Sequence, residues 1–309
     1  MPDEGHKQVR LREVGLRDGL QGIPQILPTA AKLAWIDAEF AAGVREIEVC
    51  SFVPAKLMPQ FADAADVVRH ALAVEGLTVA VLVPNVRGAE SALELGVHKL
   101  NYVTSASERH NRANVRRSRE ESLEGFRQVA RLAEGTTTTL VGGVSTAFGC
   151  TIEGPVAHRQ VMDLVQRYID AGAREIVLGD TVGYANPSAI RELVDRVLGA
   201  AAGLPVALHL HDTRGLGLAN VVAGLQAGIR DFDSALGGMG GCPHAPGASG
   251  NIVSEDLAFL LESMGWNSGI DIRKLVQVRD ILKKELHEVE LLGAIAKAGL
   301  PIGFAVADA

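Results

Sequence analysis

Cysteine is scarce in this sequence of 309 residues, and long apolar runs are absent. Three cysteines without a Cys-x-x-Cys pair are too few for a disulfide scaffold and argue against a thiolate zinc site. No apolar run approaches the roughly 20 residues of a membrane span, and the polar segment 1–12 lacks the apolar core of a signal peptide. We therefore expect a cytoplasmic protein.

Positive charge is also in short supply, because the formal net charge is -7. Nucleic acids and anionic membranes are normally bound by basic surfaces, so neither is expected as the main partner. An anionic ligand would need a local basic patch. With 47% hydrophobic residues the chain can bury a large core, and its length permits either two small domains or one α/β barrel.

A repeated pattern predicts the fold. Four segments have a glycine suited to the position just past a helix end, followed by a strand-like run: 42–49, 95–102, 171–178 and 227–234. Four further runs read as strands and precede segments of helical character: 9–14, 77–83, 136–144 and 206–211. Eight strands that alternate with helices must pair in parallel, and they fit a closed (β/α)8 TIM barrel.

The alternative fold is an open, doubly wound sheet. No Gly-x-Gly-x-x-Gly motif follows the first predicted strand, where a dinucleotide-binding fold would place it. No linker or low-complexity tract marks a second domain. We therefore predict one catalytic barrel domain over 1–309, with a C-terminal helical extension from about 266 to 309 in which 271–297 continues as helix.

Polar residues collect at the predicted carboxyl ends of the strands, where such barrels carry their chemistry. His209 and His211 lie two apart on a strand, so both rings project from the same face. With Asp18 and Asn251 they offer two nitrogens and two oxygens, which suit Mg²⁺ or Mn²⁺, although the ligand types leave Zn²⁺ open. The alternative is a pair of core histidines satisfied by their neighbours.

Three charged residues near these ligands each have two possible roles. Arg17 could stabilise negative charge that develops on an oxygen, or form a salt bridge to Asp18 or Glu48. Glu48 could be functional or a structural partner of Arg17. Asp180 could orient a histidine or cap the helix that follows it.

The segment 237–251 is unusually rich in glycine and contains Cys242 between Gly241 and Pro243. Glycines give a lid the backbone freedom to exclude water and complete a site after the substrate arrives. A thiol on such a lid could enter and leave the site, whereas Cys50 and Cys150 read as small apolar residues near strand ends. The alternative is a long turn without a catalytic role.

These motifs resemble the hydroxymethylglutaryl-CoA lyases, within a wider group of barrel metallolyases that share an Arg-Asp pair after the first strand. The resemblance covers most of the chain and is carried by residues 13–21, 47–53, 179–183, 209–213 and 240–251. It implies that Asp18, His209, His211 and Asn251 hold a divalent ion. It also implies that Arg17 faces the thioester oxygen, that Cys242 is the lid thiol, and that Glu48 and Asp180 occupy functional positions.

The reaction that the resemblance implies is a retro-Claisen cleavage of hydroxymethylglutaryl-CoA to acetyl-CoA and acetoacetate. The ion would hold the hydroxyl and a carboxylate of the substrate, and a base, with His209 as the leading candidate, would remove the hydroxyl proton. Arg17 would stabilise the acetyl-CoA enolate and Cys242 would protonate it. The expected assembly is a homodimer.

Two departures from the family pattern bear on the substrate. Gly22-Ile23-Pro24 and Val177 stand where family members commonly carry polar side chains. A related thioester such as citramalyl-CoA, cleaved to acetyl-CoA and pyruvate, is therefore an alternative substrate. Two other functions are alternatives that fit the sequence less well. A Claisen-type synthase usually carries a long C-terminal extension, and a non-catalytic metal-dependent binding protein would need neither Arg17 nor Cys242.

Coenzyme A carries several negative charges and would need a basic patch. Arg109, Arg112 and Arg116 lie in a basic run after the predicted strand 95–102, and guanidinium groups suit phosphates. The alternative is a solvated helix start.

Overall fold

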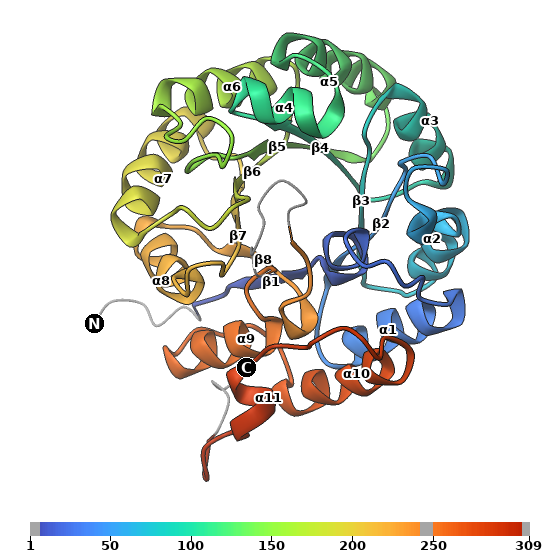
Figure 1. Ribbon diagram of the computed structural model, residues 1–309. Coiled ribbons are helices and arrows are strands. Elements are labelled where there is room, and N and C mark those ends of the chain that lie inside the picture. Colours follow the sequence, from blue (N-terminus) through green and yellow to red (C-terminus); the bar gives the residue numbers. More distant parts are fainter. Residues whose placement is uncertain (1–6, 242–249, 305–309) are drawn as a thin grey trace.

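Eight parallel strands form a closed barrel surrounded by helices in the computed structural model, which describes residues 7–241 and 250–304 (Figure 1). The strands are β1 (Arg10–Glu13), β2 (Glu46–Ser51), β3 (Thr78–Leu82), β4 (Lys99–Ser105), β5 (Thr139–Ser145), β6 (Glu175–Asp180), β7 (Val206–Leu210) and β8 (Asp231–Ser234). Each strand pairs with the next along the chain, and β8 closes the barrel against β1. The predicted TIM barrel is confirmed, and the open sheet is excluded.

The helices form an outer ring around this barrel (Figure 1). They are α1 (Thr29–Ala41), α2 (Ala64–Leu72), α3 (Val86–Leu95), α4 (Glu108–Val115), α5 (Arg119–Ala133), α6 (His158–Asp170), α7 (Pro187–Ala201), α8 (Gly217–Ala227), α9 (Ser254–Ser263), α10 (Ile272–Glu285) and α11 (Ala294–Ala298). The glycines of the four predicted helix-to-strand junctions all have positive φ, from 79° at Gly96 to 106° at Gly228. No helix in the ranges described here is long and apolar enough to cross a membrane.

The C-terminal extension differs from the prediction. The sequence suggested continuous helix over 271–297, but the structure has α10 and α11 separated by an irregular segment. Arg279 of α10 donates to the carbonyls of Leu291 and Leu292 at 2.8 and 2.6 Å, and the amide of Leu292 donates to the Gly237 carbonyl at 2.8 Å. These bonds satisfy the backbone of the segment outside a helix, so its polar groups do not require helical pairing.

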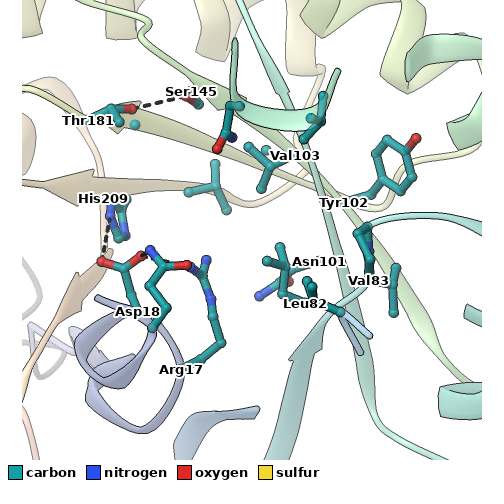
Figure 2. A pocket seen from close by; sticks show the side chains of 18 of the residues that line it. Arg17, Asp18, Leu82, Val83, Asn101, Tyr102, Val103, Ser145, Thr181 and His209 are labelled. Carbon is teal, nitrogen blue, oxygen red and sulfur yellow. Dashed lines mark hydrogen bonds and ion pairs between the residues drawn. The ribbon is translucent and has the colours of Figure 1, made fainter. Parts of the chain in front are cut away.

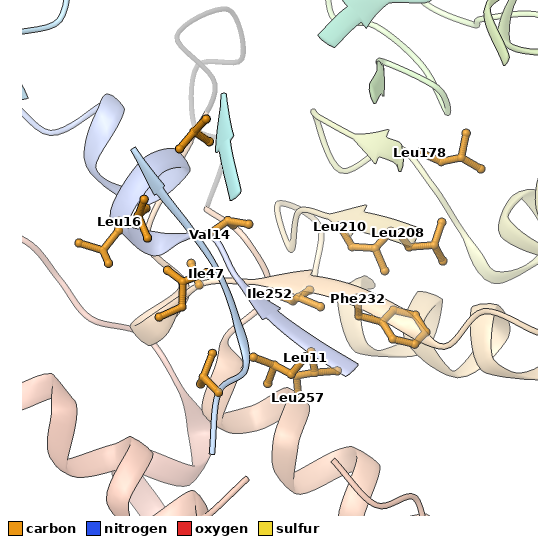
Figure 3. Packing of buried hydrophobic residues seen from close by; sticks show 14 of the residues in the cluster. Leu11, Val14, Leu16, Ile47, Leu178, Leu208, Leu210, Phe232, Ile252 and Leu257 are labelled. Atoms are coloured by element: carbon orange, nitrogen blue, oxygen red, sulfur yellow. The ribbon is translucent and has the colours of Figure 1, made fainter. Parts of the chain in front are cut away.

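The apolar core lies between the strands and the ring of helices. Figure 3 shows Leu11 of β1 beside Leu257 of α9, and Phe232 on the neighbouring strand β8. All three side chains are almost completely buried. This packing seats α9 against the outside of β1, while Phe232 of β8 lies beside Gly224 of α8.

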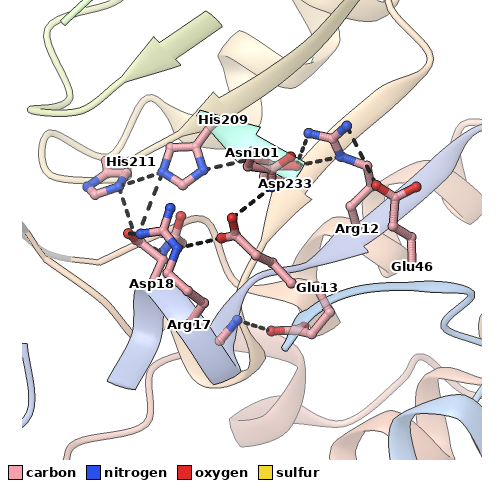
Figure 4. Close-up of polar contacts among 12 residues, drawn as sticks. Arg12, Glu13, Arg17, Asp18, Glu46, Asn101, His209, His211 and Asp233 are labelled. Carbon is pink, nitrogen blue, oxygen red and sulfur yellow. Dashed lines mark hydrogen bonds and ion pairs between the residues drawn. The ribbon is translucent and has the colours of Figure 1, made fainter. Parts of the chain in front are cut away.

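Charged side chains occupy a layer inside the barrel. Arg12 contacts Glu175 and Asp233, and Lys99 contacts Glu46 at 2.8 Å and Glu175 at 2.7 Å. All five groups are buried, and Figure 4 shows three of them, Arg12, Glu46 and Asp233. Buried charges are tolerated only when they are paired, so this layer requires β1, β2, β4, β6 and β8 to keep their register.

A glycine pair tests the packing of the ring against the barrel. A Cβ at Gly142 of β5 would lie 2.6 Å from Cγ of the buried Tyr168 on α6, whereas Gly199 of α7 is exposed with nothing within 4 Å of an added Cβ. We expect Gly142→Ala to lower the free energy of unfolding by about 1–3 kcal/mol through overpacking. Gly199→Ala should raise it by about 0.5–1 kcal/mol, since alanine suits an exposed helix better. Urea unfolding measures both, and equal effects would contradict the packing described.

Candidate active site

A cavity of about 510 Å³ opens at the carboxyl ends of the strands, where the sequence predicts the site. One side of it carries charged and ligating side chains, including Arg17, Asp18 and His209, while Val103 and Leu82 line another part (Figure 2). Ser145 and Thr181 add hydroxyl groups that are 3.1 Å apart. The cavity therefore combines a charged wall with an apolar one, as binding sites for organic substrates commonly do.

The turn that directly follows β1 positions Arg17 and Asp18. It is one turn of π-helix over Gly15–Gly19, a rare conformation that often occurs at functional sites. The carboxylate of Glu13 accepts hydrogen bonds from the amides of Gly15 at 2.8 Å and Leu236 at 3.0 Å, and from the Ser254 hydroxyl at 2.6 Å. Glu13 thus ties the turn that carries Asp18 to the segments on either side of the glycine-rich stretch.

The four predicted metal ligands converge. Nε2 of His209 lies 3.0 Å from Nε2 of His211, and these atoms lie 3.9 and 3.7 Å from Oδ2 of Asp18. Asn251 donates to the same Asp18 oxygen at 2.7 Å, and its backbone forms a β-bridge with His211. Gly240 lies against this cluster, where a Cβ would be 2.6 Å from Nδ2 of Asn251. The structure therefore brings these four side chains together, and their role as metal ligands stays a prediction.

The donor atoms of this cluster fit a cation. Asp18, His209 and His211 each offer one ligand atom, and these atoms all lie within 4.8 Å of one another. Oδ1 of Asn251 is buried and accepts no hydrogen bond from the part of the protein that the structure describes. An unpaired buried oxygen is costly, and a cation would satisfy it. Nitrogen and oxygen ligands of this kind suit a divalent ion.

The charges around the cluster set the protonation of its members. Burial, together with the nearby His209, lowers the pKa of His211 to about 4. Burial also opposes a charge on His209, but its hydrogen bond to Asp233 and the charge of Asp18 raise the pKa of His209 above its ordinary value of 6.5. For Asp18 burial is offset chiefly by Arg17, and the pKa of Asp18 is lowered. Near neutral pH, Asp18 is therefore ionised and His211 neutral, which are the forms that bind a cation.

Arg17 forms both of the salt bridges that the sequence allowed. Its Nε donates to Glu48 at 2.5 Å, and its Nη1 lies 2.7 Å from Asp18 (Figure 4). Asn101 of β4 donates to the other oxygen of Glu48 at 2.7 Å. Glu48 therefore holds the guanidinium of Arg17, and both side chains line the cavity; a functional role for Glu48 stays a prediction.

Asp180 and Asp233 differ in the contacts they make. Asp180 accepts from the amides of Tyr184 at 2.8 Å and Ala185 at 3.1 Å in the loop before α7, whose N-cap is Asn186, and burial raises the pKa of Asp180 to about 6. The carboxylate that contacts a histidine is Asp233, 3.2 Å from Nδ1 of His209. Sequence analysis missed Asp233. The available signal was the alternation Asp231-Phe232-Asp233 in a predicted barrel strand, which places both aspartates on the inward face.

The remaining predicted residues fall into three groups. Cys50 and Cys150 are buried, as expected for small apolar residues, while Cys242 lies outside the residues that the structure describes. Of the basic run, Arg116 lines the cavity, whereas Arg112 is exposed and paired with Glu108, and Arg109 is also exposed. Of the departures from the family pattern, Val177 lines the cavity and Gly22 and Pro24 are exposed.

Comparisons with known proteins agree with one family. The family model described as HMGL-like matches residues 8–282. A hydroxymethylglutaryl-CoA lyase of Bacillus subtilis is 41% identical over 280 residues, which cover 91% of this chain and 94% of that protein. The human mitochondrial hydroxymethylglutaryl-CoA lyase is 36% identical, covering 91% of this chain and 86% of that protein. A solved structure of an HMG-CoA lyase from Acinetobacter baumannii, in complex with coenzyme A and 3-methylmalate, has a TM-score of 0.92 at 39% identity and covers 97% of each chain.

Cation binding should depend on pH through a single proton. Between roughly pH 5 and the pKa of His209, Asp18 is ionised and His211 is neutral, so only His209 must lose a proton to become a ligand. The apparent affinity for Mn²⁺ should fall about tenfold for each pH unit below that pKa and level off above it. Titration of the protein with Mn²⁺ in a series of buffers measures the slope. A slope of two protons, or none, would contradict this assignment.

Proposed function

The chain belongs to the HMGL-like family, and we propose that it is a divalent-metal-dependent lyase that cleaves hydroxymethylglutaryl-CoA to acetyl-CoA and acetoacetate. The observation that carries this proposal is the convergence of Asp18, His209, His211 and Asn251 beside the fixed guanidinium of Arg17. Relatives named for this activity align over 91% of the chain, so the whole barrel takes part in the comparison.

The ligand cluster would hold Mg²⁺ or Mn²⁺. Oxygen atoms of Asp18 and Asn251 with two imidazoles leave room for oxygen ligands from the substrate, as octahedral ions require. When bound, the ion would act as a Lewis acid that polarises oxygen atoms of the substrate. The residues of the chain then have to place the substrate, stabilise the charge that develops and move the protons.

Arg17 is placed to stabilise charge. As the carbon–carbon bond breaks, the acetyl-CoA half carries negative charge on its thioester oxygen. The guanidinium stays protonated, and its bonds to Glu48 and Asp18 hold it at the wall of the cavity, so little reorganisation is needed when that charge appears.

The contacts of His209 limit its role as a base. Its Nδ1 contacts Asp233, and its Nε2 faces Asp18 and His211. An imidazole whose Nε2 holds the ion has no lone pair left for the hydroxyl proton. We therefore propose that His209 acts as a ligand while the ion is bound, and that a group with a free lone pair in the cavity accepts the proton.

Cys242 is the proposed donor of the proton that converts the enolate to acetyl-CoA. Support comes from the sequence, because a thiol in a glycine-rich segment of this pattern matches the family's lid. The described residues on both sides of that segment, Gly241 and Asn251, lie at the cavity and in the ligand cluster. A thiol that reaches the reacting carbon can act as a general acid.

The coenzyme would enter along the side of the cavity that Arg116 lines. The Acinetobacter baumannii relative is described as a complex with coenzyme A, which supports an acyl-CoA substrate. We propose that Arg116 contacts a phosphate, and that Arg109 and Arg112 add positive charge from α4. The homodimer and the cytoplasmic location stay predictions.

Turnover with a panel of thioesters tests the function. The purified protein should release acetyl-CoA and acetoacetate from hydroxymethylglutaryl-CoA in the presence of Mg²⁺ or Mn²⁺, faster than it cleaves citramalyl-CoA. Excess chelator should abolish the reaction and added metal should restore it, because the ligand cluster has no other means of polarising the substrate. Full activity in chelator would remove the metal from the mechanism, and preference for citramalyl-CoA would overturn the substrate.

Two substitutions should separate turnover from metal binding. Arg17→Met removes the fixed cation and should lower kcat by about 10²–10³, the usual loss when a donor to a developing oxyanion is removed. Cys242→Ser should lower kcat by about 10²–10⁴, because a hydroxyl is a far weaker acid than a thiol. Cys242→Ser should bind Mn²⁺ like the wild type, and Arg17→Met should still bind it through Asp18, His209, His211 and Asn251, although Asp18 loses its salt bridge. Normal turnover by either variant would show that its side chain is a spectator.

A further inference from the structure

Asp233 lies between Arg12 of the charged layer and His209 of the ligand cluster (Figure 4). One oxygen, Oδ1, is paired with the guanidinium of Arg12, whose Nε and Nη2 lie 2.6 and 2.5 Å from it. The other oxygen, Oδ2, lies 3.2 Å from Nδ1 of His209. The two oxygens of this carboxylate therefore have separate partners, one in the charged layer and one in the ligand cluster.

This division determines which nitrogen of His209 carries the proton. An ionised carboxylate only accepts hydrogen bonds, so the short contact requires a proton on Nδ1. In the neutral ring the lone pair is then on Nε2, the atom that faces Asp18 and His211. The alternative tautomer would point an N–H group at the place where a cation binds.

The charged layer has too few cations to pair with both oxygens of Asp233, so its contact with His209 is needed to satisfy the second one. Lys99 pairs with Glu46 and Glu175, and Arg12 is shared between Glu175 and Asp233, with Glu46 further away at 3.8 Å. Two cations thus face three buried carboxylates. Asp233 has Arg12 as its cation on one oxygen only, and the N–H of His209 satisfies the other.

Strand register holds the three groups in line. Arg12 of β1 is paired with Asp233 of β8, and Asp233 is paired with His209 of β7. Three adjacent strands therefore present an arginine, a carboxylate and an imidazole side by side on the inner face of the barrel. The arrangement follows from backbone pairing and does not depend on loops.

We propose that Asp233 is a positioning residue that keeps His209 in the Nδ1–H tautomer, with Nε2 directed at the cation. Arg12 restrains Asp233 in turn. This inference rests on the metal-binding part of the proposed function, and it is independent of which thioester is cleaved. Partners of this kind behind a ligating histidine commonly improve metal affinity about 10–100-fold.

Asp233→Asn is the diagnostic substitution. Arg12 can only donate, so it should keep the amide oxygen of the new side chain and leave the NH₂ group facing His209. His209 Nδ1 would then have to accept, which moves the proton to Nε2 and blocks the ligating atom. The substitution changes the tautomer without changing the size of the side chain.

Asp231→Asn is a matched control. Asp231 lies two residues away on the inward face of β8 and is buried to a similar degree, with 7% exposure against 6% for Asp233. It also pairs with an arginine, Arg10, but its register partner on β7 is Ala207 where Asp233 has His209. The two substitutions therefore make the same chemical change, and only one of them faces a histidine.

Mn²⁺ affinity of the two variants, measured by electron paramagnetic resonance without substrate, tests the inference. Asp233→Asn should weaken Mn²⁺ binding about 10–100-fold, while Asp231→Asn should stay within about threefold of the wild type. Wild-type affinity in Asp233→Asn would overturn the inference and leave the proposed function standing. Equal losses in both variants would also overturn it, and no binding by the wild type would overturn the metal-dependent function itself.

A second measurement observes the tautomer of His209 directly, first in the wild-type protein and then in Asp233→Asn. Nitrogen-15 spectra of metal-free protein labelled at histidine, recorded at a pH above the pKa of His209 so that the ring is neutral, should show His209 as the Nδ1–H tautomer, with its signal assigned from its loss in His209→Gln. In Asp233→Asn the signal should change to the Nε2–H tautomer, which a purely structural role would not produce. The Nε2–H tautomer in the wild type would overturn the inference.

Discussion

Closure of the barrel by β1 against β8 is the constraint on which the site depends. It sets Arg12 beside Asp233 and places the turn after β1 next to the segments that follow β8. Asp18 and Asn251 are 233 positions apart in the chain, yet they share a hydrogen bond of 2.7 Å because of this closure. Glu13 strengthens the junction by accepting from groups on both sides of it. A cation at this point would join the first and last strands of the barrel.

Buried charge connects the stability of the barrel to its chemistry. An unpaired ionised side chain inside a protein is costly, so the interior layer has to be nearly balanced within itself. It is balanced except at Asp233, whose second oxygen turns to the ligand cluster. The same strands that keep the layer paired thereby set the orientation of a ligand. Arg17 is held by the same principle, since Glu48 and Asp18 fix its guanidinium before any substrate arrives.

Much of the architecture could be predicted from local pattern. Glycines at helix ends and the runs after them identified four of the eight strands, because a left-handed residue at a helix end has few alternatives to glycine, and four further strand-like runs identified the others. The break between α10 and α11 could not be predicted, because the carbonyls of this segment are bonded by Arg279, which lies 12 and 13 positions away, and local pattern does not show such a contact. Asp233 was missed for a related reason. Its role depends on contacts with residues on two other strands, and local sequence does not show which residues those are.

The sequence by itself determined the parallel barrel, the rim at which chemistry gathers and the four residues of the ligand cluster, since residue type and spacing are enough to specify strand ends and donor atoms. Tertiary structure alone decided which contacts those residues make. Glu48 and Asn101 hold Arg17, Asp233 and not Asp180 contacts His209, and Arg116 reaches the cavity while Arg112 pairs with Glu108. These outcomes depend on distances across strands and on the burial of charge, and both exist only once the barrel has closed.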